Sequence, residues 1–340
     1  MVRSLGGQVE PGNVTQHDIA RHAGVSRALV SLALSDSPKV ARDTKKRILT
    51  AASELGYVRN ISAASLVSQV APIIGLILPD LANPYFEGLI SAIQKDADEP
   101  SLLPLIATAS NELNREEKIM QSFLELRVTG IISVSPATGT ESLSRFGGRI
   151  PLVVIGQPDV GSHIDTVSLN EAQAAQLLAH HFAEQGWQRA VYIYDDQAQA
   201  DRGLILRRHA LHAACGEAGL SFSAISAGQS MQSAVSVAME SSPHSTVLIG
   251  HNDLIATQIL SELRGAGYDV GQQVGVAGYD NTALSHEGNG GFTSISQPLD
   301  EISTRAISLV TTRAKRLYGP AQDVVVEPRL IVRSSTAKPL

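Results

Sequence analysis

The sequence predicts an α/β protein with a small all-α head, and three patterns lead to this fold class. From residue 72 onward, apolar strand-like runs alternate with helical stretches, as in parallel sheets with right-handed crossovers. Within the first 60 residues, three short amphipathic segments predict three helices. Residues 1–69 carry nine basic and five acidic side chains, whereas the remainder carries 18 basic and 28 acidic ones. Only the head is therefore suited to contact a polyanion.

The overall composition sets the protein class. The chain has 340 residues, enough for two domains, and 43% of them are hydrophobic. No apolar run approaches the roughly 18 residues of a membrane helix. Residues 1–12 lack the apolar core of a signal peptide, and the single Cys215 cannot form an internal disulfide. We therefore expect a cytoplasmic protein without membrane contact.

The first two helices of the head are marked by their ends. Thr15 and Asp18 have the spacing of a capping box, so a helix is expected to begin after Thr15. Gly24 can take the positive φ that ends this helix. Ser26 then caps a second helix that runs to about residue 34. A small Ala20 four residues before Gly24 lets the second helix cross closely, which is the spacing of a helix-turn-helix.

The third helix of the head is expected at 41–55, with Ile48, Ala52 and Leu55 facing inward and Gly56 as its stop. A generic three-helix bundle is the alternative, but the Ala–Gly–Val pattern beside a basic surface disfavours it.

The body contains six strand-like runs, in two groups of three. They lie at 73–78, 130–134, 152–155, 190–194, 246–249 and 274–277. Helical stretches between them include 86–97, 115–126, 172–185, 204–218 and 254–265. Two doubly wound halves with a ligand cleft at the carboxyl ends of the strands follow from this alternation.

Several motifs resemble those of the lactose/galactose-repressor family of bacterial transcription regulators. They are, in chain order, 14–26 (VTQHDIARHAGVS), 54–60 (ELGYVRN), 78–86 (LPDLANPYF), 276–282 (VAGYDNT), 295–298 (ISQP) and 328–336 (PRLIVRSST). Together they span most of the chain, and their order makes the resemblance specific. It implies a helix-turn-helix DNA-binding domain followed by a two-lobed, periplasmic-binding-protein-like effector domain.

The resemblance also implies domain boundaries. A flexible extension is expected at 1–13, the DNA-binding domain at 14–59, a hinge helix and linker at 60–71, and the effector-binding and dimerisation domain at 72–340. The chain is expected to cross between lobes near Val167, Phe292 and Asp323. The first lobe would then hold about 72–167 and 293–322, and the second about 168–292 and 323–340.

The second helix of the head would read DNA in the major groove. Arg27 and Ala28 would face base edges first, with Ser31 and Leu32 one turn later. Arg27 can donate two hydrogen bonds to a guanine, although a phosphate contact is the alternative. The candidate DNA-binding residues are Thr15, Ser26, Arg27, Ala28, Ser31, Leu32, Tyr57, Asn60, Ala63 and Leu66.

The last three of these residues belong to the implied hinge helix. Asn60 would cap it, Ala63 would allow a symmetry mate to approach, and Leu66 would enter the minor groove as an apolar wedge. A linker helix with a buried leucine is the alternative. Arg59 and Ala64 stand where relatives commonly have Pro and Arg, which predicts a weaker hinge contact.

The effector cleft is expected from residues at strand ends and from matching family positions. The candidates are Asp80, Asn83, Tyr85, Phe86, Gln157, Arg207, Asn252 and Asp280. Arg207 would grip hydroxyl or carboxylate oxygens through its planar fork, unless it forms a surface salt bridge. Asp280 could instead be only a turn residue. Gln157 follows Gly156 where relatives commonly have Asp-Arg, so a sugar or sugar-like polyol is predicted with incomplete contacts.

The predicted function is a homodimeric, sequence-specific DNA-binding regulator, a repressor whose operator affinity is set by a small ligand. Its partners would be a near-palindromic double-stranded operator and that effector. No enzyme activity, catalytic residue, cofactor or metal is expected. His209, His212 and Cys215 share a helix, but residues six apart point away from one another. The alternative is a cytosolic small-molecule-binding or hydrolytic α/β protein without DNA function, which would not need the basic head.

Overall fold

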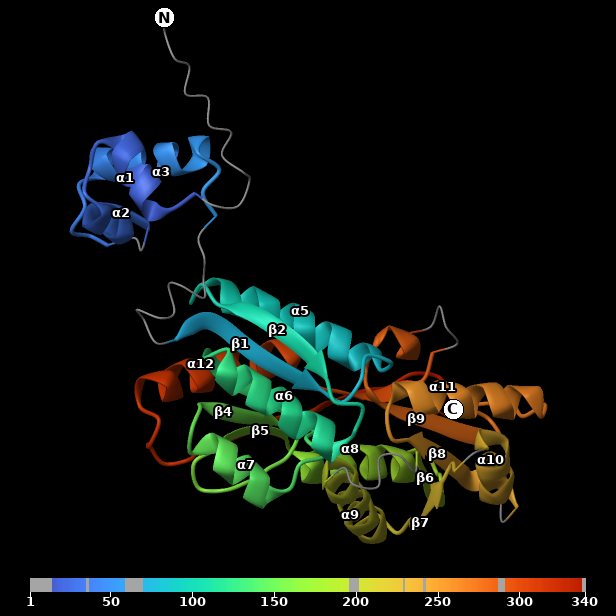
Figure 1. Cartoon of the computed structure of the whole chain (residues 1–340). Helices are drawn as coiled ribbons and strands as arrows, with labels where there is room; N and C mark the ends of the chain where they lie inside the picture. The colour runs from blue at the N-terminus through green and yellow to red at the C-terminus, as the bar shows by residue number, and fades with distance from the viewer. Residues whose placement is uncertain are drawn as a thin grey trace, which may run out of the picture. The chain divides into compact units, whose positions relative to one another are not determined.

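The computed structural model describes residues 14–34, 37–58, 70–195, 202–228, 230–240, 243–286 and 291–337 (Figure 1). The chain divides into two compact units, Met1–Gln69 and Val70–Leu340. The predicted fold class is confirmed: the first unit is helical, and the second contains two six-stranded α/β sheets.

The head consists of α1 (Gln16–Ala23), α2 (Arg27–Leu34) and α3 (Arg42–Glu54). The capping box is present, because Thr15 Oγ1 accepts from the Asp18 amide at 3.4 Å and the Thr15 amide donates to Asp18 Oδ2 at 3.0 Å. Gly24 ends α1 with φ 64°, as predicted. One buried side chain from each helix, Ile19, Val30 and Ile48, lies in the core of the head.

The first lobe is built on an all-parallel sheet in the order β11-β5-β4-β3-β1-β2. Its strands are β1 (Ala71–Leu78), β2 (Leu103–Thr108), β3 (Val128–Val134), β4 (Leu152–Ile155), β5 (Asp165–Leu169) and β11 (Asp323–Val326). Helices α5 (Pro84–Asp98) and α12 (Leu299–Lys315) pack against each other and cover one face. Helices α6 (Leu113–Glu125) and α7 (Thr140–Gly147) contribute to a separate apolar cluster on the other face.

The second lobe has the sheet order β12-β10-β9-β8-β6-β7. Its strands are β6 (Arg189–Tyr194), β7 (Ser221–Ser226), β8 (Thr246–Gly250), β9 (Val274–Asp280), β10 (Thr293–Ser296) and the antiparallel β12 (Arg329–Ile331). Buried apolar side chains of α8 (Glu171–Glu184) and α9 (Arg202–Glu217) belong to one hydrophobic cluster. Those of α10 (Met231–Met239) and α11 (Asp253–Gly265) belong to another. Two short 3-10 turns, η2 (Pro243–Ser245) and η3 (Ala283–Ser285), precede β8 and β10.

The six predicted runs correspond to β1, β3, β4, β6, β8 and β9, which occupy the middle of the two sheets. The other six strands carry a weaker pattern. β2 and β7 are edge strands, and β7 contains three serines. In β5, Asp165 and Thr166 are buried because each has a polar partner from a distant segment: Arg313 Nε donates to Asp165 at 2.6 Å, and Thr166 Oγ1 donates to Asp323 at 2.7 Å.

Strand pairing places the three crossings between lobes later than predicted. β5 continues to Leu169 before the chain leaves the first lobe. β10 pairs with β9, so the second crossing lies between Ser296 and Leu299 rather than near Phe292. β11 pairs with β5, so the third lies after Val326 rather than near Asp323. The first lobe therefore contains β11 and the second contains β10, because hydrogen bonding assigns each strand to its sheet.

Candidate functional site

The exposed face of α2 carries the four predicted base-facing side chains. Arg27, Ala28, Ser31 and Leu32 are all exposed, whereas Val30 on the opposite face is fully buried. Arg27 makes no ion pair with any residue that the structure describes. Its guanidinium is thus available to an external partner, which is compatible with either a guanine or a phosphate contact.

Three further DNA-binding candidates, Thr15, Ser26 and Tyr57, lie in the described part of the head. Ser26 Oγ accepts from the Leu29 amide at 3.2 Å, so it caps α2 as predicted. The Thr15 hydroxyl donates to Asp18 at 2.6 Å and is occupied within the head. Tyr57 is half-buried and packs against the head core. The three hinge candidates, Asn60, Ala63 and Leu66, lie outside the described residues.

A cavity of about 780 Å³ lies between the two lobes, at the carboxyl ends of their central strands. Its lining includes seven of the eight predicted effector residues: Asp80, Asn83, Tyr85, Phe86, Arg207, Asn252 and Asp280. The exception is Gln157. This side chain is buried, and its amide nitrogen donates to the Pro136 carbonyl at 2.8 Å, so its neighbours Gly156 and Pro158 line the cavity instead.

The wall from the first lobe is formed by the loop after β1 and the start of α5. Asp80 Oδ1 accepts from the Ala82 amide at 2.7 Å, which fixes this loop. Asn83 caps α5 by accepting from the Tyr85 amide at 3.0 Å. Tyr85 and Phe86 pack edge to face, with their ring centroids 5.5 Å apart. The result is a rigid aromatic surface beside a polar corner.

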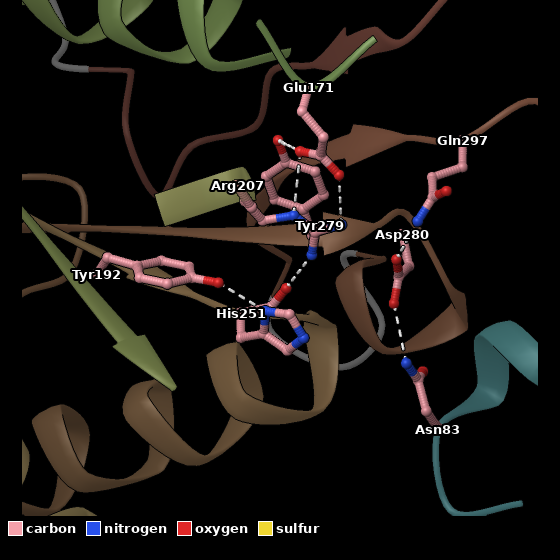
Figure 2. Close-up of polar contacts among 8 residues, drawn as sticks. All are labelled: Asn83, Glu171, Tyr192, Arg207, His251, Tyr279, Asp280 and Gln297. Atoms are coloured by element: carbon pink, nitrogen blue, oxygen red, sulfur yellow. Dashed lines mark hydrogen bonds and ion pairs between the residues drawn. The ribbon is translucent and has the colours of Figure 1, made fainter. Parts of the chain in front are cut away.

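The wall from the second lobe is organised around Arg207 (Figure 2). Its Nε and Nη2 donate to the two carboxylate oxygens of Glu171 at 3.2 and 2.9 Å, and Nη1 donates to the His251 carbonyl at 2.6 Å. The guanidinium lies 3.6 Å from the centroid of the Tyr279 ring. Tyr279 in turn donates its hydroxyl to Glu171 at 3.0 Å. Arg207 is therefore a buried ion-pair partner rather than the surface salt bridge that the sequence left open.

The electrostatics of this wall follow from burial. Desolvation and the neighbouring Arg207 hold the pKa of His251 well below its ordinary value, so its imidazole is neutral. Its Nδ1 lies 2.6 Å from the Tyr192 hydroxyl. Burial and, secondarily, the Glu171 carboxylate raise the pKa of Tyr279 well above its ordinary value. Both groups are neutral near pH 7, which leaves Arg207 and Glu171 as the charged pair.

Asp280 joins the two lobes. Its Oδ2 accepts from Asn83 Nδ2 of the first lobe at 3.0 Å, and its Oδ1 accepts from Gln297 Nε2 at 2.7 Å (Figure 2). Desolvation raises its pKa despite the opposing effects of Arg207 and of these two hydrogen bonds. Its φ of 97° is rare for a residue with a side chain, and Asp280 lines the cleft. Asp280 is thus more than the turn residue of the alternative interpretation.

A second buried carboxylate, Asp253, lies behind the cleft at the start of α11. It accepts from the Thr282 amide at 2.6 Å, the Thr282 hydroxyl at 2.9 Å and the Ser294 hydroxyl at 2.7 Å. Desolvation, with a contribution from Asp280, raises its pKa to about 7, and these hydrogen bonds only partly oppose that shift. Asp253 holds the loop after β9 in place and so positions Asp280.

Sequence reasoning missed several residues of the site, among them Glu171, Tyr192, His251 and Tyr279 around Arg207, and Asp195 and Gln297 in the cavity lining. Glu171 and His251 do follow the ends of strands, which is the signal that could have found them. Tyr192 and Tyr279 lie within apolar strands and read as core residues. Asn252 lines the cavity as predicted, but its side-chain oxygen caps α11 by accepting from Ile255 at 2.9 Å.

The described residues form neither a metal site nor a membrane span. Over the part of the chain that the structure describes, no group of three or more His, Cys, Asp and Glu side chains is placed to hold a metal ion. His212 packs edge-on against Phe222, with their ring centroids 5.6 Å apart. No helix among the described segments is long and apolar enough to cross a membrane.

The two units match two known domain families. Residues 15–60 match "Bacterial regulatory proteins, lacI family", and residues 179–336 match "Periplasmic binding protein-like domain". The chain is therefore a regulatory protein in which a helix-turn-helix head precedes a ligand-binding body of periplasmic-binding-protein type, as predicted.

Individual relatives are similar to this chain over almost its whole length. The regulator GntR of Pseudomonas aeruginosa is 29% identical over 96% of both chains, and the regulator DegA of Bacillus subtilis is 25% identical over 95% of this chain and 98% of its own. The lac repressor dimer bound to operator and the anti-inducer ONPF has a TM-score of 0.81 at 19% identity, over 95% of this chain and 99% of that one. The chain therefore combines a DNA-binding domain of the LacI family with a periplasmic-binding-protein-like domain, its relatives are transcription regulators, and the predicted DNA-binding regulatory function is confirmed.

Proposed function

We propose that this chain represses transcription as a homodimer on a near-palindromic operator, and that a small sugar or sugar-like ligand in the interlobe cleft sets its operator affinity. One observation carries the proposal: a single cleft takes side chains from both lobes, and Asn83 contacts Asp280 across it. Among solved structures of this fold, one is a complex of the regulator CelR with cellobiose, and another holds D-xylulofuranose. These complexes support a sugar-like ligand for the cleft.

Ligand control follows from contact with both lobes. A ligand that touches Tyr85 of the first lobe and Asp280 of the second favours one relative orientation of the lobes. It can shift DNA affinity only by its differential affinity for the two states, typically about 1–3 kcal/mol of coupling. A second interlobe contact, from Arg202 Nη1 to Thr140 Oγ1 at 3.0 Å, lies outside the cavity lining and depends on the same orientation.

Dimerisation is supported by the free edge of the first sheet. β2 is an edge strand, yet Leu103, Leu105 and Ile106 are exposed on it, Leu103 to 59%. Exposed apolar edge strands are rare in monomers because they pair with other chains. The partner that we propose for this edge is a second copy of the chain, because a two-fold symmetric operator binds two copies.

We propose further that the cleft binds without catalysing a reaction and that the protein acts in the cytoplasm, where its operator lies. The single cysteine, Cys215, is buried, which raises the pKa of its thiol to about 12. The Nδ1 of His251, the only imidazole among the described cleft lining, is bonded to the Tyr192 hydroxyl. A buried thiol with a raised pKa is a poor nucleophile, which supports a binding role for the protein.

The test compares operator binding with binding to random DNA. A low-salt gel shift with genomic fragments of the source organism should retain a small set, from which the operator is taken; retention of none would favour the alternative without DNA function. Arg27→Ala should weaken operator binding by about 1–3 kcal/mol. Arg21→Ala is the matched control, because Arg21 is an exposed arginine of α1. If Arg27→Ala weakens binding to operator and to random DNA equally, Arg27 contacts a phosphate and not a base.

The ligand is sought by a thermal-shift screen of sugars and polyols. A ligand that binds only the native state raises its melting temperature, and the same compound should change operator affinity. A compound that stabilises the protein but leaves operator affinity unchanged would contradict ligand control through the cleft.

A further inference from the structure

The cleft contains an arginine whose charge is already neutralised by the protein. Glu171 holds Arg207 through both carboxylate oxygens, and the two side chains are only 17% and 10% exposed. A guanidinium has five N–H donors, and the hydrogen bonds to Glu171 and to the His251 carbonyl occupy three of them. Two donors therefore remain for a ligand, but the positive charge that would attract an anion is already balanced.

The rest of the cleft lining offers no replacement for that charge. Among the lining residues that the structure describes, Arg207 is the only lysine or arginine, whereas Asp80, Glu171, Asp195 and Asp280 are acidic. The neutral His251 does not add to the positive side, since burial and Arg207 hold its pKa low. A phosphate or carboxylate entering the cleft would therefore meet a surplus of negative charge.

We propose that Glu171 is the specificity-determining residue that makes the effector site reject anions: it neutralises Arg207, so the site accepts uncharged hydroxyl-rich ligands and excludes phosphorylated or carboxylate-bearing ones. This inference rests on the proposed function only in taking the cleft as the effector site. Glu171 is a positioning residue, because it acts through Arg207. Its ion pair also fixes the guanidinium over Tyr279 and leaves only hydrogen-bond donors for the ligand.

The variant Glu171→Gln tests this directly, because Gln keeps the size and one acceptor oxygen of Glu171 while removing its charge. Arg207 is then a buried cation without a counterion, and an anion in the cleft should replace the missing carboxylate. Inorganic phosphate is the probe, so the natural effector need not be known. In the full-length protein, millimolar phosphate should raise the Tm of E171Q by several degrees. The response of the wild type should be at least tenfold weaker in apparent affinity, at equal ionic strength set with potassium chloride.

Three variants separate the ion pair from the general field of the cleft. Asp80→Asn removes one negative charge from the same lining. The Asp80 carboxylate accepts from the Ala82 and Asn83 amides and is not paired with Arg207, so this variant should not gain a phosphate response. Glu171→Asp keeps the carboxylate and should behave as the wild type. The double variant E171Q/R207Q removes the cation and should lose the gain.

Two outcomes would overturn the proposal: an equal phosphate response in E171Q and the wild type, or a gain in D80N or E171Q/R207Q as large as that in E171Q. Should E171Q fail to fold, titration of the wild type with the matched pair glucitol and gluconate decides instead. Stabilisation by gluconate but not by glucitol would show that the cleft accepts anions despite Glu171 and would overturn the proposal, whereas no such preference for gluconate supports it. Failure of the proposed function would appear separately, as a lack of retained DNA fragments.

Discussion

Replacement of Arg207 by Gln should destabilise the second lobe as well as remove the ligand response. Breaking a buried pair leaves the other charge without a partner, which costs about 3–5 kcal/mol. The contact with Tyr279, 3.6 Å from the guanidinium, contributes roughly 0.5–2 kcal/mol to that loss. We therefore expect the free energy of unfolding to fall by about 3–5 kcal/mol in R207Q.

The assay uses a reporter already present in the chain. Trp187 is the single tryptophan, is 2% exposed, and donates its indole N–H to the Thr336 carbonyl at 2.9 Å. Its fluorescence during urea unfolding therefore reports on the second lobe. E171Q should show a comparable loss, whereas E171Q/R207Q should lose about 1–3 kcal/mol less than the sum of the single variants.

The same variants distinguish an effect of Arg207 on the stability of the lobe from its effect on operator binding. At temperatures where R207Q remains folded, its ligand-free operator affinity should stay within about threefold of the wild type, or about 0.7 kcal/mol. A loss of stability under about 1 kcal/mol in R207Q, or strictly additive single variants, would show that the ion pair does not stabilise the lobe. If R207Q keeps its full ligand response, Arg207 does not contribute to effector binding.

Three further predictions concern other parts of the chain. Leu66→Ala, outside the described residues, should lower operator affinity and reduce DNA bending while ligand binding is retained; an unchanged bend in circular-permutation assays would contradict the wedge. Leu105→Asp should shift the dimer toward monomer in sedimentation because it places a charge on the exposed edge of β2, whereas Leu126→Asp, an exposed leucine after α6, should not. Asp253 has a pKa of about 7 in the folded protein against an ordinary 3.8, so the native state binds the extra proton and stability should fall as the pH rises from about 4 to about 7, by on the order of 4 kcal/mol. Between pH 5 and pH 8, urea unfolding should show about 3 kcal/mol of this loss, because about two pH units separate pH 5 from the folded pKa of about 7. The same pH dependence in Asp253→Asn would exclude Asp253 as its source.

The sequence predicts those parts of the fold whose signal is local. The central strands are continuous apolar runs, and the head helices begin and end at residues whose capping chemistry is legible, such as Thr15 and Gly24. Edge strands carry weaker patterns because one side faces solvent. β5 reads as polar because Asp165 and Thr166 are stabilised by partners that lie 148 and 157 residues away in the sequence. Such partners are set by tertiary structure and leave no local trace.

The same division applies to the site. The carboxyl ends of the parallel strands, together with matching family positions for residues such as Arg207, correctly place seven of the eight predicted residues in the cleft lining. Gln157 is the exception, because its side chain is buried in the first lobe while its neighbours Gly156 and Pro158 line the cavity. The interpretation of Arg207 as a ligand grip stays a prediction, but its partner could not be foreseen: Glu171 is 36 residues away and begins another helix. Pairing, unlike position, is a property of the folded chain.

The pairing of β11 with β5 has a consequence for biosynthesis. A ribosome releases the segment of β5 long before it makes residues 323–326, which supply the outermost strand of the same sheet. Until that strand arrives, β5 is an open edge on the nascent polypeptide, and such edges pair with other chains. Closing so long a loop adds little entropy cost, since the cost grows only with the logarithm of loop length, but it delays completion of the sheet. Premature termination before residue 323 should therefore yield an aggregation-prone product, although most of both lobes has by then been synthesised.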